Sequence, residues 1–553
     1  MHHCLQVLDI LHLIFECVRE NAHLATLVNL AVTCKLFCEP ALDVLWWSVP
    51  SAYALLNCLP DDIWEQTLTD RAVGRGKVVE RSKRKFRRVP NSSELSRCQF
   101  YTHRVRRFGV QDPPNMRISS RRMHHSDEFL SQFDVKMFPN LRELVYYVPY
   151  QEPDTISIYT YLGPSLISLS LHWDCRPSSF LRICEEIQRV CPFMEKLSVY
   201  HVSLGQHSSI FSPSIVQFSA LVSSLHLRVF HCHRCQLSDS ALQHLSQLPH
   251  LKQLEVGNTV DDLVRAIKAS NSLIAPFTGL CLLSIMAADF GRAGVDLSKI
   301  ISSTDIQELT LDHTLDKVPS EQEIHAFFQA LADSPWKDSL SSLELHRAFD
   351  VDPESDVWTS PVYRVTSSTF KPLFSLPNLQ FVQLRLENAF DLDNATLSDM
   401  ARAWPKLSTL DIGCGGTWGI SEGGLKITLD GLLPLVQHCP RLNTFSLCVN
   451  AAYNPASPSS RPGAGITNEK VLILNFCNST ISDPLEVALF LSDVFPNLLD
   501  IVAWSEGWLP TEDSHSATEK WNEVCQLLPA LTRARRQERA YRAQNQSTAT
   551  RIE

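Results

Sequence analysis

The sequence predicts an α/β protein in which a short N-terminal module of three helices precedes a long array of repeated strand–helix units. Two observations predict this fold. Near the N-terminus, apolar residues recur three and four positions apart, as they do on one face of a helix. From about residue 138 to 504, a strand-like apolar spacing recurs with helical patterns between the recurrences. Hydrophobic residues make up 44% of the 553 residues and charged residues 20%, which excludes a mainly disordered chain.

We expect the first 50 residues to form one module of three short helices. Apolar residues follow the helical period over residues 5–18 and again over 24–37. We expect Pro40 to end the second helix, because proline lacks an amide donor and clashes with the preceding turn. A third helix is predicted at 41–47. Such small helices bury little apolar surface alone, so the module needs a partner or a following domain.

Residues 51–125 predict a connector that contains an exposed basic segment. The segment from Arg71 to Arg88 contains nine basic residues and one acidic residue, Glu80. One short strand is expected at 104–110. The basic segment is typical of a solvated linker, with a nuclear import signal or a nucleic-acid contact as alternatives. A net charge of −10 disfavours nucleic-acid binding by the whole protein.

The region 126–531 predicts a leucine-rich-repeat array. The template is L-x-x-L-x-L-x-x-N/C-x-L, with a strand at its centre. Successive matches start 24 to 39 residues apart. The apolar positions are Leu141/Leu144/Tyr146, Leu166/Leu169/Leu171, Met194/Leu197/Val199, Leu227/Phe230/Cys232, Leu251/Leu254/Val256, Leu280/Leu283/Ile285, Ile306/Leu309/Leu311, Leu340/Leu343/Leu345, Leu379/Val382/Leu384, Leu407/Leu410/Ile412, Leu442/Phe445/Leu447, Val471/Leu474/Phe476 and the incomplete Leu498/Ile501.

Proline marks the boundary between a helix and the next strand. Several units begin with a bulky residue or Cys followed by Pro, as in Phe138-Pro139 and Cys191-Pro192. Proline just after a helix end cannot continue the helix and turns the chain into the strand. Stacked units bury one continuous core, so we expect a solenoid with parallel strands on the concave face and helices on the convex face. Residues 532–553 predict a basic tail, helical or disordered.

One short motif is typical of hydrolases. Residues 419–423 match G-x-S-x-G, in which Ser421 would be the nucleophile. That elbow needs a strand that runs directly into a sharp turn and a helix, but Gly413, Gly415 and Gly416 separate the motif from the preceding strand pattern. We therefore predict a glycine-rich loop and no catalytic site.

The segment His231-Cys232-His233-Arg234-Cys235 contains residue types that bind zinc. No second pair follows at zinc-finger spacing. The repeat template also accounts for the cysteines, since Cys232 and Cys235 occupy positions where a small apolar side chain packs inward. We favour this structural interpretation and expect no metal and no cofactor.

The 17 cysteines are odd in number and scattered, a pattern typical of reduced thiols in the cytoplasm or the nucleus. The N-terminus lacks the basic region of a signal peptide. No apolar run reaches the length of a transmembrane helix, so we expect no contact with a membrane.

Residues 5–47 resemble an F-box. The family pattern is an apolar residue, Pro, an acidic–apolar step, Ile/Leu-x-x-Ile-Phe, a helix ending in Cys-Arg/Lys-x-Phe, and Leu-Trp. The matching residues are Val7, Leu8, Asp9-Ile10-Leu11, Leu13-Ile14-Phe15, Leu30-Ala31, Thr33-Cys34-Lys35, Phe37 and Leu45-Trp46. Leu8 stands where the family usually has Pro. Together with stretches such as residues 37–64 and 494–501, the chain resembles the leucine-rich F-box proteins of basidiomycete (mushroom-type) fungi.

The resemblance implies a substrate receptor of a Skp–cullin–F-box ubiquitin ligase. Its partners would be the Skp adaptor, a cullin reached through that adaptor, and an unknown protein substrate bound by the repeats. The receptor itself would perform no bond chemistry. The positions that the family uses to contact the adaptor correspond here to Val7, Leu8, Ile10, Leu11, Ile14, Leu30, Cys34, Phe37, Leu45 and Trp46.

Two alternatives stay open. The chain could be a leucine-rich scaffold for protein interactions without a role in a ligase. An enzyme would depend on Ser421 or Cys235, neither of which has a supporting set of residues in the sequence. The repeat pattern fixes the inward side chains only, so it does not identify the substrate.

Overall fold

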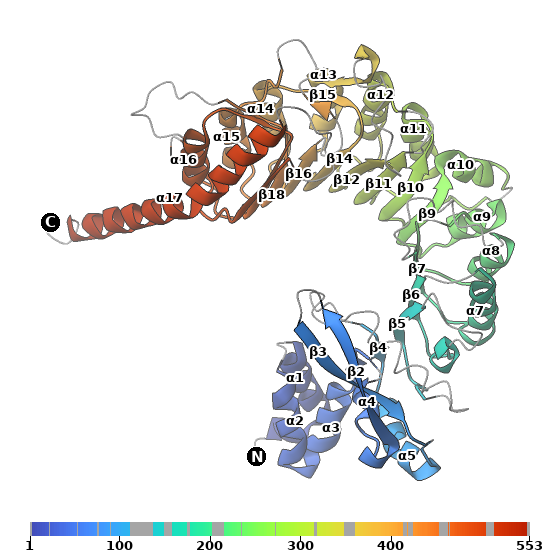
Figure 1. The fold of residues 1–553 in the computed structure, drawn as a ribbon. Coiled ribbons are helices and arrows are strands. Elements are labelled where there is room, and N and C mark those ends of the chain that lie inside the picture. The colour runs from blue at the N-terminus through green and yellow to red at the C-terminus, as the bar shows by residue number, and fades with distance from the viewer. Residues whose placement is uncertain are drawn as a thin grey trace. The chain divides into compact units, whose positions relative to one another are not determined.

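A computed structural model shows an α/β protein with long runs of parallel strands (Figure 1). The residues that it describes are 3–20, 23–51, 53–73, 77–88, 90–110, 137–148, 157–173, 177–201, 215–233, 235–270, 273–313, 318–347, 360–412, 417–418, 424–452, 463, 465–504 and 514–549.

The chain divides into two compact units, Met1–Ala241 and Leu242–Glu553. The division lies within one strand–helix unit, since α9 spans it. The boundaries that the sequence predicts at residues 50, 125 and 531 stay predictions.

Among its described residues, the first unit carries six parallel strands in the order β1-β4-β5-β6-β7-β8. Their bounds are β1 Ser48–Val49, β4 Arg107–Phe108, β5 Glu143–Val148, β6 Ser168–Trp173, β7 Lys196–His201 and β8 Val229–Cys232. Its helices are η1 His3–Gln6, α1 Leu8–Glu20, α2 Leu24–Thr33, α3 Lys35–Leu45, α4 Tyr53–Leu56, η2 Asp61–Ile63, α5 Ser92–Thr102, η3 Ser157–Thr160, α7 Pro177–Val190, α8 Ile215–Ser224 and α9 Asp239–Gln247, which crosses into the second unit.

In the described part of the second unit, the main sheet has nine parallel strands. In order they are β9 Gln253–Thr259, β10 Leu282–Ala287, β11 Glu308–His313, β12 Ser342–Arg347, β14 Phe381–Arg385, β16 Thr409–Ile412, β18 Thr444–Ser446, β20 Ile473–Cys477 and β22 Asp500–Ala503. Short strands form two smaller parallel sheets: β13 Arg364–Thr366, β15 Ala389–Asp391 and β17 Thr417–Trp418 in one, β19 Asn450–Ala451 and β21 Thr480–Ile481 in the other.

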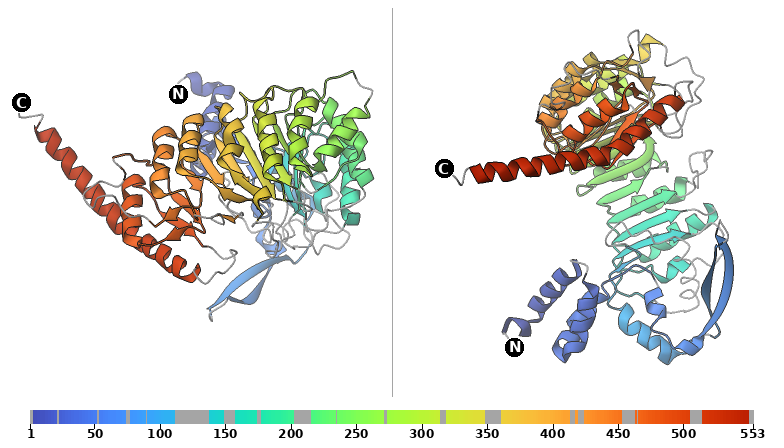
Figure 2. Two further views of the ribbon diagram at one scale, coloured as in Figure 1. Left: turned by 90° about the horizontal axis from the view of Figure 1, so that it is seen from above. Right: turned by 60° about the vertical axis from the view of Figure 1, so that its left-hand side comes forward.

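Apart from α17, the described helices of the second unit line one side of its main sheet (Figures 1 and 2). They are α10 Val260–Lys268, α11 Phe290–Ile300, α12 Glu321–Ala332, η5 Pro361–Tyr363, α13 Ser367–Phe370, η6 Lys371–Ser375, α14 Asn394–Ala403, η7 Leu429–Leu432, α15 Leu433–His438 and α16 Pro484–Val494. Helix α17 Ser514–Ala549 follows β22. Local sequence sets where they begin. At α12, the Ser320 hydroxyl accepts from the Glu323 amide while the Glu323 carboxylate accepts from the Ser320 amide, a capping box.

The repeat prediction is confirmed, because each of the 13 apolar sets coincides with one strand and is buried. Leu283, Leu309 and Leu343 show how the core forms. They lie opposite one another on β10, β11 and β12, and each side chain is 0% exposed. The recurring spacing therefore places one layer of leucines per strand in a continuous core.

The expectation that Pro40 ends a helix is wrong. Helix α2 ends earlier because Cys34 is extended, with φ −158° and ψ 161°. Helix α3 then starts at Lys35 and contains Pro40. The proline removes only the amide that would bond the carbonyl of Leu36, and the helix continues to Leu45.

The region 51–125, which we expect to be an exposed connector, contains more regular secondary structure than the one predicted strand. It contains an antiparallel hairpin of β2 Trp64–Val73 and β3 Lys77–Phe86, followed by α5. The expected strand at 104–110 is the shorter β4, which joins the parallel sheet between β1 and β5. Residues 111–125 lie outside the described part of the chain.

The expected basic tail at 532–553 is helical as far as Ala549, since it continues α17. The first half of that helix packs on the end of the repeat array, with Trp521, Val524 and Leu528 buried. The last repeat thereby has its apolar core covered, as the end of a repeat array requires.

Candidate protein-binding surfaces

The three N-terminal helices have a small core of their own. Leu11 and Phe15 of α1, Leu27 of α2, and Ala41 and Val44 of α3 are buried against one another. Such a core is small for independent stability, and further apolar side chains surround it.

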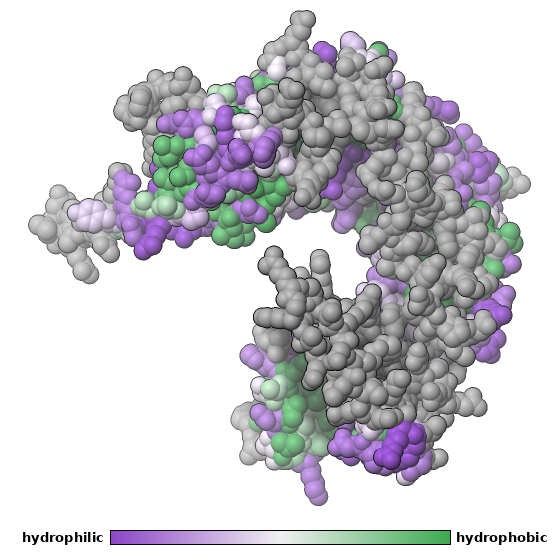
Figure 3. Space-filling model, viewed as in Figure 1, coloured by the Kyte–Doolittle hydropathy of each residue, from purple (hydrophilic) through white to green (hydrophobic). Residues whose placement is uncertain are grey.

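Nine large apolar side chains on this module are exposed to solvent. Their exposed fractions run from 36% to 80%, with Val32 at the upper end. Figure 3 shows hydrophobic residues gathered over the three helices. An exposed apolar surface of this kind marks an interface in soluble proteins. The nine residues are Val7, Leu8, Ile10, Leu13, Ile14, Leu24, Val28, Val32 and Leu36.

The residues predicted for adaptor contact divide into two groups. Val7, Leu8, Ile10 and Ile14 belong to the exposed apolar surface. Leu11 is 0% exposed and lies in the module's own core, so it supports the surface rather than forming it.

The other predicted positions are half-buried. Leu30, Phe37 and Leu45 pack against the small core, and Cys34 has intermediate exposure. The Phe37 ring meets the Phe15 ring edge-on at 5.7 Å between centroids. Trp46 stacks on Tyr101 of α5, with 4.5 Å between ring centroids. This second group therefore fixes the helices relative to each other and to the following segment.

Sequence reasoning missed five members of the exposed apolar surface: Leu13, Leu24, Val28, Val32 and Leu36. The helical spacing in the sequence could have identified three of them. Leu24, Val28 and Val32 lie four residues apart on α2, so they share one face of that helix. The helical period shows that such a face exists, but it does not show whether the face is covered.

A charged cavity of about 500 Å³ lies beside the module, lined by α1, α3 and the segment before β4. Arg104 anchors it. Its side chain is 5% exposed and pairs with Asp43 and with Glu39 of α3. Burial disfavours the charged guanidinium, but the hydrogen bonds and charges of these two carboxylates outweigh it and raise the pKa of Arg104. The ion pairs tie α3 to the start of the sheet.

The strand face of the first unit carries a stack of three rings. Tyr147, His172 and Tyr200 lie opposite one another on β5, β6 and β7. The ring centroids are 4.2 Å apart for the first pair and 5.0 Å for the second. Burial lowers the pKa of His172, which favours its neutral imidazole at neutral pH. Rigid aromatic side chains of this kind are frequent anchors in protein interfaces.

The strand face of the second unit carries a polar network across four strands. His346 of β12 lies 3.6 Å from an oxygen of Asp312 on β11 and 2.9 Å from the amide oxygen of Gln383 on β14. The amide nitrogen of Gln383 and Nε of Arg385 each donate to Oδ2 of Asp411 on β16 at 2.9 Å. Hydrogen bonds therefore hold these side chains in fixed positions on the open face.

The structure describes the cysteines of the possible zinc motif but not the residues of the hydrolase-like motif. Cys232 and Cys235 are buried free thiols, and burial raises the pKa of Cys232 well above its usual value. Among the described residues, no three His, Cys, Asp or Glu side chains converge as metal ligands would. Ser421 and its glycines lie outside the described residues.

Most side chains of the basic segment also lie outside the description, although the backbone of residues 71–73 and 77–86 belongs to the β2–β3 hairpin. Arg88 at its end is described, and it pairs with Asp62 and Glu94. Within the described chain, no helix combines the length and apolarity that crossing a membrane requires.

Comparisons with solved structures give likenesses that include the two described below. No protein-family model matches the chain, and no curated protein matches it. The chain is similar to a crystal structure of Rad7 and Elc1 in complex from yeast, with 12% identity and a TM-score of 0.35 over 71% of this chain and 87% of that one. It is also similar to a protein from Bacteroides fragilis, with 15% identity and a TM-score of 0.21 over 61% of this chain and 65% of that one. These TM-scores are too low to establish a shared fold.

Proposed function

We propose that this chain is the substrate-recognition subunit of a Skp–cullin–F-box ubiquitin ligase. The three-helix module would act as an F-box that binds a Skp adaptor, and the repeats would bind a protein substrate. The observation that carries the proposal is the exposed apolar surface of the module. In the described part of the module, nine large apolar side chains are exposed, whereas five residues form its buried core.

The energetics of that surface favour a permanent partner. Each large apolar side chain gains roughly 1.5–3 kcal/mol when it is fully removed from water. Only part of that gain appears as affinity, since association itself costs free energy. Several such side chains on adjacent helices are nevertheless enough for a stable interface.

The mechanism needs no catalytic residue on this chain. Binding of adaptor and substrate to one chain raises the local concentration of substrate near the ubiquitin-charged enzyme. The open strand faces of the repeats offer extended surfaces for the substrate. The rigid ring stack at Tyr147, His172 and Tyr200 is one region where it would bind.

The test is titration calorimetry of the full chain against a purified Skp adaptor. The variant Ile10→Asp with Ile14→Asp places two charges on one face of α1, so we expect affinity to fall at least about thirtyfold. A matched control is Leu499→Asp, an apolar residue that is 79% exposed in the second unit. It should bind like the wild type.

Two outcomes would reject the proposal. The first is absence of adaptor binding by the folded wild-type chain. The second is equal affinity of the wild type and the Ile10→Asp, Ile14→Asp variant. Wild-type binding to the adaptor without recruitment of a cullin would favour the alternative of an interaction scaffold outside a ligase.

A further inference from the structure

The outward-facing strand positions of the second unit are strongly acidic. Along each strand, alternate residues point into the leucine core or away from it. On β11, Leu309 and Leu311 are buried in that core, so Glu308, Thr310 and Asp312 point to the opposite face. The described helices of the main array lie on the core side (Figures 1 and 2).

The outward positions on the nine main-sheet strands of the second unit carry six carboxylates, one guanidinium and one imidazole. The guanidinium is Arg385 and the imidazole is His346. A surface of one sign attracts ligands of the opposite sign and repels nucleic acids and acidic segments. The six carboxylates are Glu255, Glu308, Asp312, Glu344, Asp411 and Asp500.

Asp411 provides a second, independent indication of a cationic ligand. Its side chain is 6% exposed, and its Oδ2 accepts from both Gln383 and Arg385. Its Oδ1 is buried and has no hydrogen-bond partner among the described residues. A buried carboxylate oxygen without a donor is unfavourable, so an N–H donor from outside would be stabilised there. Arg385, which donates to Oδ2, is 53% exposed, so its pair with Asp411 borders the solvent on this face.

The network around Asp411 holds the acidic positions in place before a ligand arrives. Glu344, Gln383 and Asp411 are in register on β12, β14 and β16. His346 lies 3.5 Å from Glu344 and 3.6 Å from Asp312, between the two carboxylates. Because these side chains are already ordered, a ligand would lose little free energy in ordering them.

We propose that this acidic strand face binds an Arg- or Lys-rich segment of a protein. The inference rests on the proposed receptor function and specifies the substrate class that the second unit recognises. Glu344 and Asp411 are two strands apart, about 10 Å at the usual strand spacing. Three residues of an extended peptide span about the same distance, so a basic residue at every third position matches the two carboxylates.

The probe is a fluorescent peptide of about 12 residues with Arg at every third position and Ser and Gly between, a length that spans four such intervals. Fluorescence anisotropy with the full chain at low salt measures its affinity. We expect binding that weakens as salt rises, and at least tenfold weaker binding by the Asp411→Asn, Glu344→Gln variant. The control Glu519→Gln removes an exposed carboxylate on α17 and should bind as the wild type does.

Further measurements keep the test decisive. If Asp411→Asn disturbs folding, Glu308→Gln is the second variant, because Glu308 is exposed and outside the buried network. Equal binding of a peptide with Glu in place of Arg, or undiminished binding by Glu308→Gln and by the double variant, would overturn the inference. Peptide binding without adaptor binding would reject the receptor function alone. Adaptor binding without peptide binding would reject the acidic site alone.

Discussion

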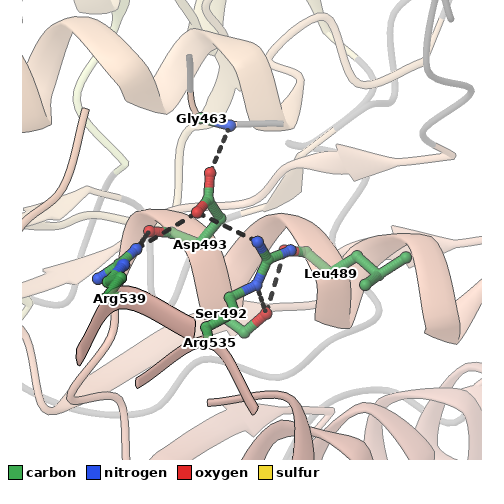
Figure 4. A network of polar contacts seen from close by, with 6 residues as sticks. All are labelled: Gly463, Leu489, Ser492, Asp493, Arg535 and Arg539. Atoms are coloured by element: carbon green, nitrogen blue, oxygen red, sulfur yellow. Dashed lines mark hydrogen bonds and ion pairs between the residues drawn. The ribbon is translucent and has the colours of Figure 1, made fainter. Parts of the chain in front are cut away.

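Asp493 and Arg535 join the last repeat to the C-terminal helix. Asp493 of α16 is 0% exposed, and its Oδ1 lies 3.2 Å from the guanidinium of Arg535 on α17 (Figure 4). Arg539 donates to the same oxygen at 3.3 Å, and the amide of Gly463 donates to the other oxygen at 3.2 Å. Arg535 also donates to the Ser492 hydroxyl. The negative charge of this buried carboxylate is thus balanced by two guanidinium groups of α17, a helix that begins about twenty residues later in the chain.

We predict that Arg535→Ala destabilises the second unit. The change removes a charged donor from a carboxylate that stays buried, at a cost of about 2–4 kcal/mol. Urea unfolding followed by circular dichroism measures the loss. Arg533→Ala is the control, since Arg533 is exposed on the same helix. Equal unfolding midpoints for the two variants would show that α17 does not stabilise the array through this pair.

The leucine core of the repeats gives a second prediction. Leu309 is 0% exposed between Leu283 and Leu343, so Leu309→Ala leaves a cavity and should cost about 2–5 kcal/mol. Its neighbour Thr310 points to the open face, and Thr310→Ala should change stability little. Thermal unfolding of both variants provides the comparison. A shift near zero for Leu309→Ala would contradict the core described here.

His346 gives a pH-dependent prediction. Burial opposes its protonation, but hydrogen bonds to Asp312 and Gln383 and the charges of Asp312 and Glu344 outweigh burial and raise its pKa above 6.5. A raised pKa in the folded state stabilises that state below the unfolded value, and the contribution is lost as pH rises through the folded value. The stability gap between wild type and His346→Gln should therefore be larger at about pH 5.5 than at about pH 8.

Urea midpoints at the two pH values test the sign of this effect. His515→Gln is the control, because the His515 side chain is 87% exposed and should make no comparable difference. A gap that grows toward high pH would mean that the carboxylates around His346 do not stabilise its protonated form.

The repeat strands were predictable because each strand places three apolar residues in a fixed spacing. Leu280, Leu283 and Ile285 specify β10 without reference to any other part of the chain. β1 was missed because a two-residue strand cannot display that spacing. It is a strand only because its backbone pairs with β4 in the sheet.

The polar surfaces were less predictable, since they depend on register between distant strands. Gln383 and Asp411 are 28 residues apart, and loops of irregular length decide which outward residues become neighbours. Sequence periodicity assigns Asp411 to the open face but does not pair it with Arg385. The apolar face of α2 was visible in the same way, while its exposure depends on what the rest of the chain leaves uncovered.

The final prediction concerns Leu8, the residue that stands where F-box proteins usually have proline. Helix α1 begins at Leu8, and the amide of Leu11 donates to the carbonyl of Val7 at 3.1 Å. Leu8 thus holds the first helical position, where proline is tolerated because its missing amide would have no partner within the helix. We expect Leu8→Pro to leave the unfolding midpoint and the adaptor affinity unchanged or slightly higher.

Leu13→Pro is the contrasting variant for this prediction. It lies inside α1, where proline removes a helical hydrogen bond and clashes with the preceding turn, at a cost of about 3 kcal/mol. Unfolding and adaptor titration of both variants separate the effect of proline itself from the effect of its position. If Leu8→Pro reduced stability as much as Leu13→Pro, Leu8 would not occupy the start of the helix, and the alignment of this module with the F-box pattern would fail at its first contact.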